Sequence, residues 1–392
     1  MSFDWRYRHT VLTCLTAAFF ATMFARVAIS PVVPNVEEQF DVSTGMVGLA
    51  LTGMWAAYGL SQFPSGVLGD RIGDRRVMLI ATSLTALCVL LVALAPTFWL
   101  FATFVVLLGA GAGLHYTVAT TYLTRLFENT GRAIGIHVAG GPLAGVLAPV
   151  VVAAVAVRYG WRPALLIAVA IALPATVLLW WFVRPTAPRQ PDRPMRERFE
   201  AGSLSRLLSR PEIAYTTLLA VLATFVWQAT TSFLPTLLAV HHGFSIPAAG
   251  LLFSVYFAVQ GVLVPGIGWA SDRFGRDRVL VLVLGAGVPG YAALAVGNST
   301  TMVLAGVGLA AVAMSWSAPL QARFIHHLSE SERNAGFGLV RTVYVLLGAL
   351  GSVVTGVLAD VAGWAVAAGA LATLLAIAAV SIAIVRVVRS DW

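Results

Sequence analysis

The feature that most constrains this chain is a series of long apolar runs, separated by short segments that contain charge, Pro or Gly. The runs lie near residues 9–33, 45–68, 77–96, 98–125, 132–157, 161–183, 213–240, 248–270, 278–297, 300–327, 334–359 and 364–388. A helix needs roughly 20 apolar residues to cross the hydrocarbon core of a membrane. Charged residues make up 11% of the chain, against about 25% in soluble domains. We therefore predict an all-α integral membrane protein with twelve transmembrane helices.

The basic residues, all of them Arg, are distributed unequally between the segments that join these runs. Twenty of the 25 fall at the termini and in alternate connections, whereas the opposite connections hold only Arg158 and Arg162. Because cytoplasmic loops carry the excess of basic residues, we expect both termini in the cytoplasm and the protein in the cell membrane. The same placement accounts for the net charge of +8, so we expect lipids and no nucleic acid as partners.

The residues that could support chemistry are sparse. Cys14 and Cys88 both lie inside apolar runs, which favours neither a disulfide nor a metal-ligand spacing. The histidines at membrane depth have no carboxylate or cysteine near them in the sequence that would complete a metal or nucleophile site. We expect no enzyme activity, no cofactor and no metal.

The longest polar stretch, residues 184–212, divides the chain into two similar halves. We expect a bundle of six helices over residues 1–183, a cytoplasmic linker over 184–212 and a second bundle of six over 213–392. Residues 66–73 (GVLGDRIG) match residues 268–275 (GWASDRFG) at an offset of 202, and Gly48 and Gly250 keep the same offset. Such repeated halves are typical of transporters that bind solute between them near the bilayer midplane.

Residues 66–76 carry a more specific signal, because they resemble the signature loop between the second and third helices of the major facilitator superfamily. The matching residues are Gly66, Asp70, Arg71, Gly73 and Arg75 in the first half and Gly268, Asp272, Arg273 and Gly275 in the second. Asp74 and Asp277 depart from the usual pattern, which has a basic residue there. The resemblance implies two pseudo-symmetric six-helix bundles, alternating access, and a role for both loops in gating on the cytoplasmic side.

Two further signatures of that family are incomplete. Val105 occupies the place in the fourth helix where many proton-coupled relatives have Arg. The Gly/Pro-rich stretch from Gly140 to Pro149 resembles the antiporter motif only loosely, and small residues also serve close helix packing. The mode of coupling stays open, with a coupling proton or an exchanged anion as the alternatives.

Arg26 is the sharpest candidate for a binding residue, since charge inside a bilayer is costly and usually functional. Thr22, Arg26 and Ser30 recur at four-residue spacing and therefore share one helix face. The second half has Thr224, Gln228 and Ser232 at the offset of 202, and the resemblance implies that these two helices line the central cavity. Two other interpretations stay open: Arg26 reaches the headgroups, or it only bonds backbone carbonyls.

The remaining polar groups at depth complete the candidate site. The predicted substrate-binding residues are Thr22, Arg26, Ser30, His115, Tyr116, Gln228, Arg341 and Tyr344, and His115 and His137 are candidate proton carriers. All 17 acidic residues fall in predicted loops, termini or helix ends. Since no carboxylate is expected at depth to balance a cation, the two Arg side chains favour an anion, either a small carboxylate or an inorganic oxyanion.

We therefore predict a monomeric secondary transporter of a small anion. Two alternatives stay open: an exporter of neutral or hydrophobic compounds, in which Arg26 is structural, and a non-transporting membrane receptor or scaffold. The sequence does not distinguish uptake from export.

Overall fold

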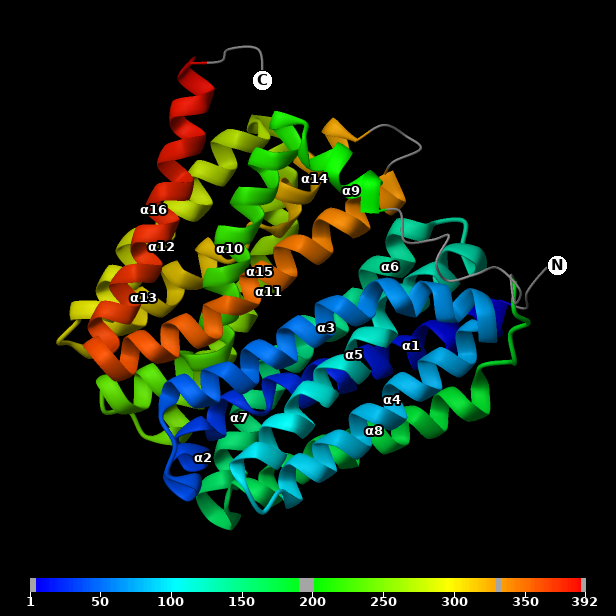
Figure 1. Ribbon diagram of the computed structural model, residues 1–392, viewed down its shortest axis with the longest axis horizontal. Coiled ribbons are helices and arrows are strands. Elements are labelled where there is room, and N and C mark those ends of the chain that lie inside the picture. The colour runs from blue at the N-terminus through cyan, green and yellow to red at the C-terminus, as the bar shows by residue number, and fades with distance from the viewer. Residues whose placement is uncertain (1–4, 190–200, 329–332, 389–392) are drawn as a thin grey trace. The chain divides into compact units, whose positions relative to one another are not determined.

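The computed structural model describes residues 5–189, 201–328 and 333–388, and this part of the chain is helical with no strand (Figure 1). In the first half the helices are α1 (Trp5–Val27), α2 (Val33–Phe40), α3 (Thr44–Ile72), α4 (Asp74–Leu94), α5 (Phe98–Leu126), α6 (Thr130–Val138), α7 (Gly140–Tyr159) and α8 (Trp161–Phe182). They are followed by α9 (Ala201–Leu208), α10 (Pro211–Thr236), α11 (Ile246–Phe274), α12 (Arg276–Val296), α13 (Thr300–Ala313), α14 (Ser317–His327), α15 (Arg333–Ala362) and α16 (Trp364–Val388). The all-α prediction is confirmed.

The apolar runs correspond to the long helical segments. Among the described residues, eleven segments are long and apolar enough to span a membrane, and α3, of 29 residues, is the remaining long helix over a predicted run. Of the predicted linker, residues 190–200 lie outside the described part, and α9 occupies Ala201–Leu208.

Four of the predicted runs are interrupted rather than continuous. The first passes from α1 through a 3-10 turn, η1 (Ser30–Val32), into α2, because Pro31 and Pro34 lack the N–H that a continuous helix needs. A break at Ala139 separates α6 from α7, and residues 314–316 separate α13 from α14. After Pro235, α10 continues as a π-helical segment, η3 (Leu237–His241).

The chain forms two compact units. Unit 1 contains residues 1–42 and 53–199, and unit 2 contains residues 43–52 and 200–392. In unit 1, α4 packs against α5 and α8, and α1 packs against α7 and α8. In unit 2, α12 packs against α13 and α16, and α10 packs against α15. The helix α3 therefore contributes its first residues to unit 2 and the rest to unit 1.

The first turns of α3 are held tightly in unit 2. The Asp360 carboxylate at the end of α15 accepts hydrogen bonds from the Thr44 N–H at 3.0 Å and the Gly45 N–H at 2.7 Å. Thr52 Oγ1 donates to the Ala349 carbonyl at 2.9 Å and accepts from the Val353 N–H at 3.0 Å. A carboxylate at a helix N-terminus satisfies N–H groups that have no partner inside the helix.

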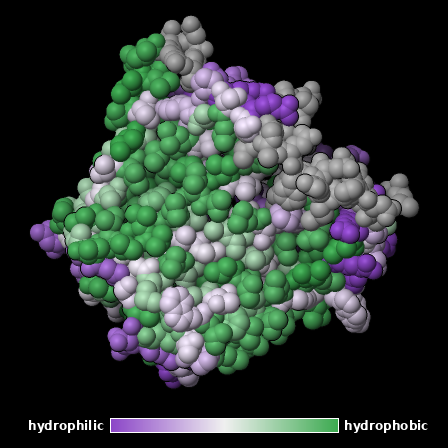
Figure 2. All heavy atoms as spheres, in the orientation of Figure 1, coloured by the Kyte–Doolittle hydropathy of each residue, from purple (hydrophilic) through white to green (hydrophobic). Residues whose placement is uncertain are grey.

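Large apolar side chains remain on the surface, as expected for helices that face lipid. Trp181 is 71% exposed and Leu282 is 73% exposed. Figure 2 shows apolar residues covering much of the face drawn, with hydrophilic residues gathered toward helix ends. Soluble proteins rarely leave such continuous apolar surface.

Candidate functional site

Arg26 lies in the last turn of α1 and is buried, with 3% of its surface exposed. Its guanidinium carbon stands 3.9 Å from the centre of the Tyr58 ring and 5.2 Å from that of Trp55. Its Nε donates to the Thr22 carbonyl at 3.2 Å, and one Nη lies 3.4 Å from the Met23 sulfur. The side chain does not extend to the surface, so the headgroup interpretation fails, whereas the predicted bond to a backbone carbonyl is present.

Glycines on α5 place the aromatic residues beside Arg26. A Cβ on Gly109 would meet the Met54 carbonyl oxygen at 2.0 Å, and a Cβ on Gly113 would meet the Tyr58 carbonyl oxygen at 2.4 Å. Only glycine allows α3 to come this close, and small residues are the usual means of close helix packing in membranes. The contact fixes the turn of α3 that carries Trp55 and Tyr58.

The predicted polar stripe of the first helix is only partly regular. Thr22 shares a turn of α1 with Arg26, and its hydroxyl donates to the Phe19 carbonyl at 3.0 Å. Ser30 is buried but begins the 3-10 turn, three residues beyond the end of α1. Thr22 and Arg26 therefore share a helix face, and Ser30 does not continue that helix.

His115 and His137 are brought together, with ring centres 5.6 Å apart. Both are fully buried, His115 on α5 and His137 in the last turn of α6. Phe19 of α1 lies 5.1 Å from the His137 ring and 5.7 Å from the Tyr116 ring. The sequence places the two histidines in different helices and does not predict that they meet, whereas in the structure they form one cluster.

The predicted residues of the second half lie in unit 2. Gln228 is buried on α10, and its amide Nε2 donates to the Val345 carbonyl of α15 at 3.2 Å. The neighbouring Tyr344 is buried and stacks on Phe324, with ring centres 6.2 Å apart. Arg341 lies one turn earlier on α15 and is half-buried. Thus Gln228 contacts the turn of α15 that carries Tyr344.

The first signature segment forms the end of α3 and the first turn of α4 rather than a loop. The helix α3 ends at Ile72, and Gly73 alone joins it to α4 with a φ of +91°, a conformation that favours glycine. Asp70 binds Arg189 in an ion pair of 2.5 Å. The Arg75 N–H donates to Thr186 Oγ1 at 3.0 Å, whereas Arg71 is exposed.

Asp74, the residue that departs from the family pattern, is the buried centre of this charge cluster. Its carboxylate accepts hydrogen bonds from Arg125 of α5 and from Arg189, the latter at 3.2 Å. The Asp74 side chain is 3% exposed, against 37% for Arg125 and 34% for Arg189. The sequence shows Asp74 only as a departure from the family pattern and does not predict its partners, Arg125 and Arg189.

The second signature segment is built differently. Gly275 again joins two helices with a positive φ of +94°, but Asp272 and Arg273 are exposed. The charge pair here joins Arg323 of α14 to Asp277, and Arg323 Nε donates to Thr216 Oγ1 at 3.0 Å. In both units an Arg from a neighbouring helix therefore binds the Asp that replaces the usual basic residue.

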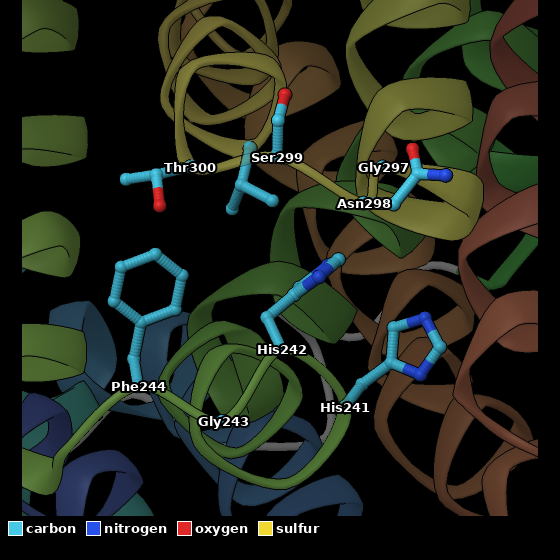
Figure 3. A pocket seen from close by; sticks show the side chains of 9 residues that line it. His241, His242, Gly243, Phe244, Gly297, Asn298, Ser299 and Thr300 are labelled. Atoms are coloured by element: carbon cyan, nitrogen blue, oxygen red, sulfur yellow. The ribbon is translucent and has the colours of Figure 1, made fainter.

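Unit 2 also contains a cavity of about 380 Å³, which Figure 3 shows from close by. His241 and His242 line it from one side and Asn298, Ser299 and Thr300 from the other. Each histidine Nε2 bonds a backbone carbonyl, His241 that of Ala295 at 3.1 Å and His242 that of Leu294 at 2.9 Å. Burial lowers the pKa of His242. None of the predicted site residues lines this cavity.

Comparison with known proteins agrees with the fold. The family model of the Major Facilitator Superfamily matches residues 15–249 and 216–391. A crystal structure of a bacterial homolog to the human lysosomal transporter Spinster aligns with a TM-score of 0.82 at 18% identity, covering 97% of each chain.

Curated relatives differ in what they do. A membrane sensor protein from Escherichia coli is 30% identical over 46% of this chain and 41% of its own length. The hexuronate transporter of Bacillus subtilis is 24% identical over 93% of this chain and 90% of its own length. A multidrug resistance protein from Yersinia enterocolitica is 26% identical over 73% of this chain and 70% of its own length. The first of these matches spans less than half of the relative.

The residues matched by the family model cover most of the chain, from the first helix to the last, and include both signature segments. The helical fold and the aligned crystal structure agree with it. The chain belongs to the Major Facilitator Superfamily.

Proposed function

We propose that this chain is a secondary transporter that moves a small organic or inorganic anion across the cytoplasmic membrane by alternating access, with Arg26 as the residue that binds the anion's charge. The observation that carries the proposal is a permanently charged side chain buried in a membrane-spanning segment, at 3% exposure. A buried charge in a membrane helix is expensive and usually marks a substrate or ion pathway.

The surroundings of Arg26 support recognition rather than simple anchoring. Tyr58 stacks on the guanidinium at 3.9 Å, which is attractive and keeps the planar group in one orientation. All guanidinium donors lie in that plane, in a fork that matches carboxylate or phosphate geometry. No acidic residue occurs on α1, α5, α6 or α7, and Asp70 of α3, the helix that carries Tyr58, binds Arg189. A bound anion would therefore add negative charge to this part of unit 1.

The relatives give independent support for an anion. Hexuronate, the solute named for the B. subtilis relative, is a carboxylate, and that relative aligns over 93% of this chain. For unit 2 we propose Gln228, Arg341 and Tyr344 as substrate contacts, and for unit 1 also Thr22, Ser30, His115 and Tyr116. We further propose cytoplasmic termini and gating roles for Asp70, Arg71, Asp272 and Arg273.

Uptake by purified protein in proteoliposomes tests the assignment. The probes are radiolabelled galacturonate, gallate and sulfoacetate, with uncharged galactose as the comparison. We expect saturable uptake of at least one anion and a loss of about tenfold or more in Arg26→Gln, since a charged hydrogen bond contributes about 1.5–3 kcal/mol. Arg158→Gln is the matched control, because Arg158 also lies near a tyrosine ring, at 5.7 Å, but is exposed. Full anion uptake by Arg26→Gln would refute the role of Arg26.

A second candidate is export of neutral or hydrophobic compounds, which the multidrug resistance relative supports. In that case an uncharged dye, and not the anions, would be transported, and Arg26→Gln would affect stability rather than selectivity. A third is a sensor without transport, which the E. coli relative supports. A sensor would bind an anion, detected as a rise in melting temperature, without moving it.

A further inference from the structure

We propose that His115 and His137 form a two-imidazole site that takes up one proton together with the anion, so that the pair couples proton movement to anion transport. The inference rests on the proposed transport of an anion at Arg26 and adds the coupling ion and its residues. It concerns unit 1 alone.

The pair is buried in an apolar enclosure with unused hydrogen-bonding capacity. His115 Nε2 lies 3.3 Å from the Leu15 carbonyl oxygen of α1. Among the described residues, His115 Nδ1 is buried without a hydrogen-bond partner, and the Leu15 carbonyl that contacts His115 is also the backbone acceptor beside the His137 ring. Two rings that share one carbonyl oxygen have more ring nitrogens than that carbonyl can bind, so they retain the capacity to hold a proton between them.

The spacing of the rings suits a shared proton. Two imidazoles joined by an N–H···N hydrogen bond of about 3 Å have ring centres about 5 Å apart. The observed separation is 5.6 Å, with an angle of 43° between the planes, so a small rotation of one ring makes the bond. A proton entering from water binds the free lone pair of one nitrogen, and the imidazolium N–H then donates to the other ring. No other bond is made or broken, and the same proton leaves to water on the opposite side.

The charges around the pair explain why proton and anion would move together. The helices that pack against α5 and α6, which carry the pair, are α1, α4 and α7, and α3 approaches α5 at Tyr58. The carboxylates on these helices, Asp70 and Asp74, bind Arg125 and Arg189. The other charged residues are Arg6, Arg8, Arg26, Arg71, Arg75, Arg76, Arg132 and Arg158, and Tyr116 lies 6.4 Å from His137. A buried imidazolium without an opposite charge is unfavourable. A bound anion supplies that charge, and a monovalent anion with one proton is electrically neutral.

A single helix face connects the two proposed sites. Leu15, Phe19, Thr22 and Arg26 follow each other at spacings of four, three and four along α1, which places them on one face. The Leu15 carbonyl contacts His115, and Phe19 packs on both histidines. Phe19 and Arg26 are seven residues apart, or roughly 10 Å along the helix axis, close enough for charge coupling in a medium of low dielectric.

Proteoliposomes with trapped pyranine test the coupling. Labelled galacturonate is followed in two modes, as exchange at equal pH and as accumulation driven by an imposed pH gradient. For His137→Gln, which is not a proposed substrate contact, we expect exchange within about twofold of wild type, loss of accumulation by about tenfold or more, and loss of the pyranine signal. For His115→Gln, a proposed substrate contact, we expect the same loss of accumulation and of the pyranine signal, with exchange reduced as well. The matched control is His326→Gln, because His326 is exposed on α14 in unit 2. Retained accumulation in both variants would overturn the proposal.

A second measurement applies if the variants lose exchange as well, or if the wild-type protein does not transport galacturonate. Protein labelled with ¹⁵N-histidine is acidified stepwise from about pH 8 to about pH 5, across the range in which histidine titrates, with sulfate present as the anion. We expect the His115 and His137 ring signals to shift together and each single variant to alter the shift of the remaining ring. Independent titration, or none, would overturn the pair, whereas failed anion transport with a shared shift would overturn only the proposed function.

Discussion

The guanidinium carbon of Arg26 lies 3.9 Å from the centre of the Tyr58 ring, and both side chains are at most 8% exposed. A cation above an aromatic face is attracted by about 2 kcal/mol when both groups are desolvated. The stack covers one face of the guanidinium, so its hydrogen-bonding donors are directed sideways, in the plane parallel to the ring.

Two substitutions of Tyr58 distinguish the contribution of its aromatic ring to anion binding from that of its hydroxyl group. Tyr58→Phe keeps the aromatic face, so we expect anion affinity within about twofold of wild type. Tyr58→Leu removes the face, and the loss of about 1–2 kcal/mol should weaken binding by roughly 5–30 fold. The measurement is the ligand concentration that gives half-maximal thermal stabilisation. Equal affinities in the two variants would show that the ring is not what holds Arg26.

Gly109→Ala tests the close packing of α3 against α5. A methyl group at Gly109 would stand 2.0 Å from the Met54 carbonyl oxygen, whereas one at Gly285 of α12 meets nothing within 4 Å. Away from a clash, Gly→Ala in a helix stabilises by up to about 1 kcal/mol. We therefore expect a lower melting temperature for Gly109→Ala and an unchanged or higher one for Gly285→Ala. A stable Gly109→Ala protein would contradict this packing.

The fold follows from the sequence far more directly than the site does. The all-α architecture is predictable because an apolar run of sufficient length has few alternatives to a membrane helix. Arg26 is conspicuous for the same reason. The packing of α3 against Gly109 and Gly113 of α5 decides which turn of α3 faces Arg26. Tyr58 could therefore not be identified from the sequence as the residue that stacks on Arg26. The pairing of Asp74 with Arg125 and Arg189 joins residues 51 and 115 positions away, and charge alone does not indicate such partners.

Removing the negative charge of Asp74 should destabilise the protein less than removing the positive charges of Arg125 and Arg189. In Asp74→Asn the partly exposed Arg125 and Arg189 can turn to water, so we expect a loss of at most about 1 kcal/mol in the free energy of unfolding. Replacing both arginines with Met leaves a carboxylate that is 3% exposed without its partners, which costs about 3 kcal/mol or more. Urea or thermal unfolding in detergent measures both, with the exposed Glu38→Gln as control. Equal losses would argue against a buried carboxylate.

His242 predicts a dependence of stability on pH. Burial lowers its pKa below the ordinary value of about 6.5, so the unfolded chain binds a proton more readily than the folded one. The stability contributed by neutral His242 is fully present above that ordinary value and is lost as the pH falls through the lowered pKa. The melting temperature should fall between about pH 7.5 and pH 5, and His242→Gln should reduce the fall. An identical pH profile in the variant would exclude His242 as its source.

Because α3 is divided between the two units, the point at which the chain is split decides whether each fragment can fold. A fragment that starts at α9 lacks Ser43–Thr52, so the carboxylate of Asp360 and the backbone around Ala349 and Val353 lose the groups that they bind. Such a fragment is incomplete, because the residues that these groups bind belong to the other fragment. Two separately encoded halves should therefore complement each other when they are produced in the same membrane. Neither half should be stable when it is produced alone.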